Sequence, residues 1–125
     1  MEYNTKKIQS FTDLEVWREG HKLVLMIYEL TKQFPKEEVF GLISQLRRAA
    51  ISITSNIAEG FARFSYREKT QFYLMARGSL TELQNQLFIA KDVGYLTDKE
   101  FTKIINQSTI VHKLLNALIR KNKES

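Results

Sequence analysis

The stretch SQLRRAAISITSNIAEGFARFS, residues 44–65, decides the fold. Its apolar residues recur every three or four positions, which is the spacing of one buried helix face. A polar file runs beside that face at the same spacing. It consists of Gln45, Arg48, Ser52, Ser55, Asn56, Glu59 and Arg63. Ser and Asn weaken helix interiors because their side chains compete for backbone hydrogen bonds, so the file needs an explanation.

Helix start signals lie on both sides of this stretch. Three hydroxyl residues, Thr12, Ser65 and Thr97, each precede a Glu by three positions, the pattern of a capping box. Pro35 suits the first turn of another helix, and Gly94 suits a left-handed helix stop. These signals predict helices at about residues 13–33, 36–63, 66–93 and 97–122, with residues 1–10 and 121–125 frayed.

The short connections make consecutive helices antiparallel, so we predict an all-α, up-down-up-down four-helix bundle that forms a single domain over residues 1–125. The apolar spacing of the third helix is typical of a core face. Its core positions are Tyr73, Ala76, Leu80, Leu83, Leu87 and Ala90. No strand-like alternation competes with this pattern.

The first helix is more apolar than one member of a bundle requires. LVLMI at residues 23–27 covers the whole circumference for more than one turn. A helix that is apolar all round is buried all round, which favours packing against another subunit. The alternative is a scatter of exposed apolar residues, which is common on protein surfaces.

The composition excludes several classes of protein. The chain has no cysteine, so it has no disulfide framework, thiol nucleophile or cysteine zinc site, and a reducing cytoplasm is favoured. No apolar run approaches the roughly 20 residues that span a bilayer, so we expect no membrane contact. The net charge is +5, and the excess lies in residues 47–77 and 101–125, which makes nucleic acid a candidate partner.

The basic residues of the first block are the candidate nucleic-acid contacts. They are Arg47, Arg48, Arg63, Arg67, Lys69 and Arg77. We expect them to cluster near the corner between the second and third helices, with Phe64, Tyr66 and Tyr73 among them. Guanidinium groups bind phosphates and aromatic rings stack on bases. The competing interpretation is a set of intramolecular ion pairs and solvated charges.

The polar file has two interpretations of its own. It forms a closed hydrogen-bond network that fixes helix register, or it lines a ligand site. The network is favoured, because Glu59 and Glu82 can pair with arginines of the same two helices. Its predicted members are Ser52, Asn56, Glu59, Ser79 and Glu82.

No residue pattern indicates catalysis, a metal or a cofactor. Di-iron bundles need Glu-x-x-His pairs, and neither His21 nor His112 has a Glu three residues before it. His21 falls in the apolar stripe of the first helix and is predicted to be a core or interface residue. No phosphate-binding loop or nucleophile elbow is present, so we predict that the protein is not an enzyme.

Several short motifs resemble those of the proteins encoded in intervening sequences of bacterial 23S rRNA genes. They include FTDLEVW at residues 11–17, QLRRAA at 45–50, NIAEG at 56–60, RGSLTE at 77–82 and DVGYL at 92–96. The resemblance implies an up-and-down bundle that assembles as a ring, with a homopentamer expected. The accessory variability protein of diversity-generating retroelements is similar in fold, and it engages nucleic acid and a reverse transcriptase. The resemblance supplies no catalytic residues.

The sequence thus favours a cytoplasmic, non-enzymatic oligomeric scaffold that binds RNA or DNA backbone, with a nucleic-acid-processing protein as a further partner. The alternative is a protein-interaction adaptor ring that binds no nucleic acid.

Overall fold

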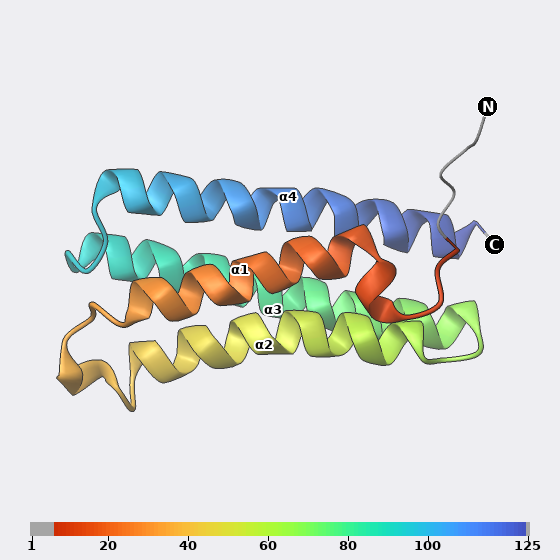
Figure 1. Ribbon diagram of the computed structural model, residues 1–125, viewed down its shortest axis with the longest axis horizontal. Helices are drawn as coiled ribbons and strands as arrows, with labels where there is room; N and C mark the ends of the chain where they lie inside the picture. The colour runs from red at the N-terminus through yellow and green to blue at the C-terminus, as the bar shows by residue number, and fades with distance from the viewer. Residues whose placement is uncertain (1–6, 125) are drawn as a thin grey trace.

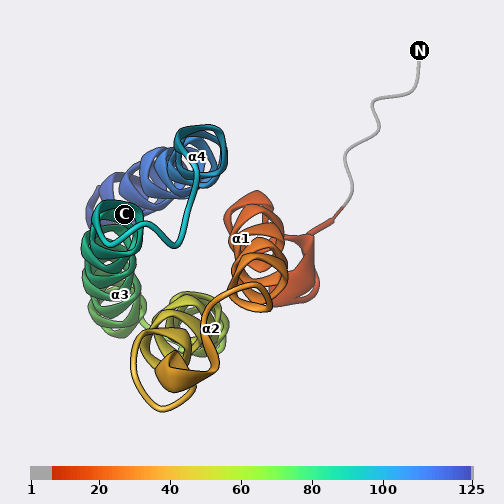
Figure 2. The same ribbon diagram turned by 90° about the vertical axis from the view of Figure 1, so that its left-hand side faces the viewer.

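The computed structural model describes residues 7–124, which form four long helices and two short 3-10 turns (Figure 1). In chain order these are η1 (Phe11–Asp13), α1 (Glu15–Thr31), η2 (Lys36–Glu38), α2 (Leu42–Phe61), α3 (Tyr66–Asp92) and α4 (Asp98–Lys123). Consecutive helices run in opposite directions, and α1 closes the bundle against α4 (Figures 1 and 2). The prediction of an all-α four-helix bundle is confirmed. None of the described helices has the length and apolar character that a bilayer crossing requires.

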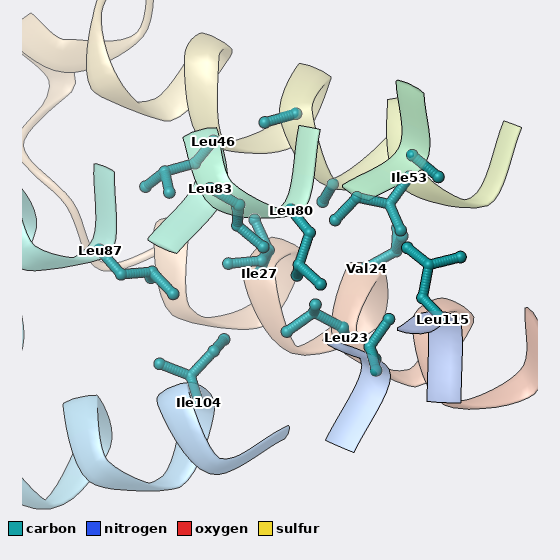
Figure 3. Packing of buried hydrophobic residues seen from close by; sticks show 14 of the residues in the cluster. Leu23, Val24, Ile27, Leu46, Ile53, Leu80, Leu83, Leu87, Ile104 and Leu115 are labelled. Atoms are coloured by element: carbon teal, nitrogen blue, oxygen red, sulfur yellow. The ribbon is translucent and has the colours of Figure 1, made fainter. Parts of the chain in front are cut away.

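The core lies along the bundle axis and takes side chains from all four helices (Figure 3). Leu23 and Ile27 of α1, Leu46 of α2, Leu83 of α3 and Ile104 of α4 belong to this core, and all five side chains are fully buried. All six predicted core positions of the third helix are buried. Apolar spacing therefore identified the inner face of α3 correctly, because that face is set by local helix geometry alone.

The prediction of a capping box at Thr12 is wrong. The box forms two residues earlier and caps η1: Ser10 Oγ accepts from the Thr12 amide at 3.0 Å, and the Asp13 carboxylate accepts from the Ser10 amide at 3.1 Å. Helix α1 then begins at Glu15, with Leu14 at its N-cap and no side chain capping it.

The second helix begins six residues later than predicted from Pro35. Pro35 starts only the η2 turn, and α2 begins after Gly41. Glu38 explains the break, since its carboxylate accepts from the Leu42 amide at 3.1 Å and so caps α2 where Gly41 offers no side chain. A Cβ at Gly41 would lie 2.7 Å from Glu38 Oε1, so glycine leaves room for this cap. Val39, which precedes α2, is 45% exposed.

The predictions at the C-terminal half are closer to the structure. Thr97 and Glu100 form the complete predicted capping box of α4, and Gly94 has the predicted left-handed conformation with φ of 88°. Helix α4 continues to Lys123 with Asn122 buried, so the predicted fraying from residue 121 is wrong there. The prediction of frayed ends at residues 1–6 and 125 lies outside the described residues.

Candidate nucleic-acid interface

The seam between α2 and α3 contains part of the predicted polar network. The hydroxyls of Ser52 and Ser79 share a hydrogen bond of 2.8 Å across the two helices. The Asn56 amide donates to the Ser52 carbonyl at 2.8 Å and to its hydroxyl at 3.1 Å. Because these side chains are short, the two helices can approach closely while each polar group finds a partner. Three of the five predicted network members are thus joined.

The two carboxylates of the predicted network are not joined to it. Glu59 pairs with Arg63, which lies just beyond the end of α2, at 2.9 Å, and both side chains are about half exposed. Glu82 instead lines a groove of about 480 Å³ between α2 and α3. The other residues of this groove are Phe40, Ser44, Gln45, Arg48, Ala49 and Ser52. Arg48 makes no ion pair or hydrogen bond within residues 7–124, so it remains available to an external anion.

Two of the predicted basic contacts point away from the seam toward other helices. Arg47 donates to the Thr31 hydroxyl on α1 at 2.9 Å, and its guanidinium lies 4.4 Å from the centre of the Tyr28 ring. Arg77 donates to the Asn116 side chain on α4 at 3.1 Å. These guanidinium groups already have partners inside the bundle, as the competing interpretation of the basic block expects.

Lys69 caps the end of α2. Its ammonium donates to the carbonyl oxygen of Phe61 at 2.6 Å and to that of Gly60 at 3.4 Å, in the last turn of the helix. The Gly60 oxygen also accepts from the Arg63 amide at 3.2 Å. The ammonium also lies 5.3 Å from the centre of the Phe61 ring. Burial lowers the pKa of Lys69 from its usual value. Its charge therefore stabilises the end of α2, where the chain turns into α3.

Arg63 and Arg67 flank the same connection at the molecular surface. Arg63 stacks over Phe72 at 4.6 Å in addition to pairing with Glu59. Arg67 is exposed and makes no ion pair or hydrogen bond in the described part of the chain. Two aromatic side chains stand beside them in solvent, Phe64 at 101% and Tyr66 at 52% of full exposure. Tyr73, predicted to lie among the arginines, is buried instead.

The six predicted basic residues therefore do not form one cluster. Arg48 lies in the first half of α2, and the connection to α3 begins after Phe61. At a rise of 1.5 Å per residue, Arg48 is therefore about 20 Å from this connection along the helix. Arg47 and Arg77 face α1 and α4. Sequence spacing placed all six near one corner, but partners on other helices decide where each long side chain goes.

The last turn of α4 supplies basic residues that the sequence analysis did not select. Arg120 and Lys123 are exposed there, at the end of the bundle that also holds the α2–α3 connection (Figure 1). The charge excess of residues 101–125 was the available signal. We call Arg63, Arg67, Arg120 and Lys123, with Phe64 and Tyr66, the basic end.

Of the two predicted positions of His21, core and interface, the core position is wrong. It is exposed rather than buried in the core, and its ring stacks on Trp17 with the ring centres 4.7 Å apart. The apolar stripe of α1 turns away from His21 because α1 packs through Leu23, Val24 and Ile27.

Comparison with known proteins agrees with this fold. A crystal structure at 1.70 Å of a protein with unknown function from the S23 ribosomal protein family of Bacteroides thetaiotaomicron VPI-5482 is similar, with a TM-score of 0.78 and 25% sequence identity. The match covers 83% of this chain and 97% of that one. No curated protein matches the sequence. The family model of the 23S rRNA-intervening sequence proteins matches residues 12–117, and the chain belongs to this family.

Proposed function

We propose that this chain is a non-enzymatic, self-assembling scaffold that binds the phosphate backbone of RNA or DNA through its basic end. One observation carries the proposal. Arg67 has no partner within residues 7–124, and the exposed aromatic rings of Phe64 and Tyr66 lie close to it in the chain. Cations that neutralise phosphates, next to aromatic faces on which bases stack, are the two components of a surface that binds single strands without sequence preference.

The neighbouring charges favour the same proposal. The ion pair of Arg63 is with an exposed carboxylate, and exposed ion pairs contribute little, so a phosphate can compete with Glu59 for this guanidinium. Arg120 and Lys123 add positive charge from α4. Two acidic residues, Glu37 and Asp98, lie at the opposite end of the bundle, at the starts of η2 and α4.

Self-assembly is supported by an apolar outer face on α1 and α2. Leu25 is 57% exposed and Ile51 is 41% exposed, and Tyr28 lies beside them under Arg47. Leu25 precedes Tyr28 by about one turn and Ile51 follows Arg47 by one turn, so on antiparallel helices both point to the same side. A second copy of the chain would cover this face. Together with the resemblance to ring-forming proteins, this favours a homo-oligomer, with a pentamer expected.

Fluorescence anisotropy of labelled RNA and DNA across a salt series tests the binding. The double variant Arg63→Gln, Arg67→Gln should bind more weakly and with a smaller salt slope, by on the order of one unit per lost phosphate contact. Lys99→Gln, which removes a charge at the opposite end, is the matched control, and Arg48→Gln tests the groove separately. A wild-type protein that binds neither nucleic acid at low salt would leave the adaptor ring as the better explanation.

Light scattering after size-exclusion chromatography tests the assembly. The variant Leu25→Glu, Ile51→Lys should run as a monomer with the same helix content by circular dichroism. A wild-type protein that is already monomeric at micromolar concentration would contradict the scaffold.

A further inference from the structure

A hollow of about 370 Å³ lies between the first turns of α3 and the last turn of α4. It is lined by Tyr66, Arg67, Thr70, Gln71, Asn122 and Lys123, and we call it the α3–α4 hollow. Two of these side chains are cationic, and none is acidic. The hollow opens at the end of the bundle where the α2–α3 connection and the end of α4 come together (Figure 1).

Asn122 is the unusual residue of this hollow. It is only 8% exposed, and its amide nitrogen is buried without a hydrogen-bond partner. Leaving a buried donor unsatisfied costs on the order of 1–3 kcal/mol, so native proteins rarely keep one without a reason. Asn122 lines the hollow, so a ligand with an acceptor group that enters the hollow would supply the partner that this amide lacks.

The charges around the hollow favour an anion. Arg67 and Lys123 contribute two positive charges, and the 27-residue helix α3 directs the positive end of its dipole to this place. The C-terminal dipole of α4 opposes them, but the last turn of that helix is basic. The nearest carboxylate on α3, that of Glu68, does not line the hollow and accepts a hydrogen bond from the Ser65 hydroxyl at 3.1 Å.

We propose that the α3–α4 hollow is a binding site for one phosphate group of a nucleic acid. Arg67 and Lys123 neutralise the phosphate, the Asn122 amide donates to one of its oxygens, and the half-exposed Tyr66 ring stacks on the attached base. The inference rests on the proposed function and deepens it, because it turns a diffuse basic end into a defined subsite that includes a neutral, buried donor.

Asn122→Leu is the decisive variant. It replaces an unsatisfied buried amide by an apolar side chain of similar size, so the fold should keep or gain stability, while the donor is lost. We expect affinity for a 5′-phosphorylated oligonucleotide to fall on the order of tenfold, with the net charge of the protein unchanged. The variant Arg67→Gln, Lys123→Gln should weaken binding further, and Lys99→Gln should not.

Three probes separate the possible sources of the phosphate: inorganic phosphate, the 5′-phosphorylated oligonucleotide and the same oligonucleotide with a 5′-hydroxyl. If Asn122→Leu loses affinity only for the 5′-phosphorylated oligonucleotide, the subsite binds a terminal phosphate. If it loses affinity equally for both oligonucleotides, the subsite binds an internal phosphate. The Asn122 side-chain NH₂ signals in a ¹⁵N spectrum should shift with the oligonucleotides that bind, and with inorganic phosphate only at much higher concentration.

Different results would overturn the phosphate subsite and the proposed nucleic-acid binding. If wild-type protein binds oligonucleotides and Asn122→Leu binds them equally well, the subsite is overturned while the basic end stands. If wild-type protein binds no oligonucleotide at low salt, the proposed function itself is overturned. A folded Asn122→Leu protein, verified by its melting temperature, is required for the first comparison.

Discussion

The ammonium of Lys69 donates to the carbonyl oxygen of Phe61 across the α2–α3 connection at 2.6 Å. Sequence position and charge had placed Lys69 among the candidate phosphate ligands. Its contacts show instead a positive charge at the C-terminal end of α2, where the helix dipole is negative and backbone acceptors lack helical partners. The residue therefore links the first turn of α3 to the last turn of α2.

Lys69→Met should therefore act on stability. It keeps the aliphatic stem but removes the charged hydrogen bonds, and a hydrogen bond to a charged group contributes about 1.5–3 kcal/mol. We expect urea unfolding to show a loss of that order, with oligonucleotide affinity at temperatures well below unfolding changed less than twofold. Lys99→Met, at the exposed start of α4, is the control and should leave stability within about 0.5 kcal/mol. If Lys69→Met kept its stability but lost oligonucleotide affinity, Lys69 would be a nucleic-acid contact instead.

Two helical glycines should respond to alanine in opposite directions. At Gly60 a Cβ would lie 2.6 Å from Cε1 of the buried Tyr73 ring and 3.1 Å from Phe72 Cβ, so Gly60→Ala forces α2 and α3 apart and should cost about 1–3 kcal/mol. At Gly78 a Cβ meets nothing within 4 Å, so Gly78→Ala should gain about 0.5–1 kcal/mol from the smaller entropy of the unfolded chain. Chemical denaturation of both variants tests the pair. A stabilised Gly60→Ala protein would refute the close packing of α2 on Tyr73.

Glu38 joins the start of α2 to the α3–α4 connection, and its removal should lower the stability of the fold. One carboxylate oxygen accepts from the Leu42 amide at 3.1 Å, and the other accepts from the Tyr95 hydroxyl at 2.9 Å, between α3 and α4. Glu38→Ala should cost about 1–2 kcal/mol, since both a helix cap and a side-chain hydrogen bond are lost, and Tyr95→Phe should cost less. A double-mutant cycle measured by thermal unfolding should give a coupling near 1 kcal/mol between the two. Additive effects would mean that the Tyr95 contact contributes nothing.

Tyr73 should make the protein sensitive to alkali. Burial raises the pKa of its hydroxyl to about 12, from an ordinary value near 10 in the unfolded chain. The folded state therefore holds this proton more tightly, so the contribution of Tyr73 is fully present below about pH 10 and is lost as the pH rises toward about 12. Between these values the free energy of unfolding should fall more steeply for wild type than for Tyr73→Phe. Parallel curves in urea titrations at several pH values would show that Tyr73 ionises as freely as in the unfolded chain.

The extent of the helices and the inner face of the bundle could be predicted from the sequence, because both depend on local geometry. The box at Thr97, the stop at Gly94 and the six core positions of α3 follow from spacing within a few residues. The exceptions are also local in origin. Ser10 competes with Thr12 as a cap, and the carboxylate of Glu38 caps α2 after Gly41, while Pro35 begins only the η2 turn.

The candidate site was decided by tertiary structure. Six basic residues look equivalent in the sequence, yet Arg47 is held by Thr31, Arg77 by Asn116 and Lys69 by the end of α2. These partners lie on other elements, and long flexible side chains reach them only once the helices have packed. Apolar spacing, helix start and stop signals and short connections thus predicted the four-helix bundle, while the packing of the helices decided which charges have partners inside it.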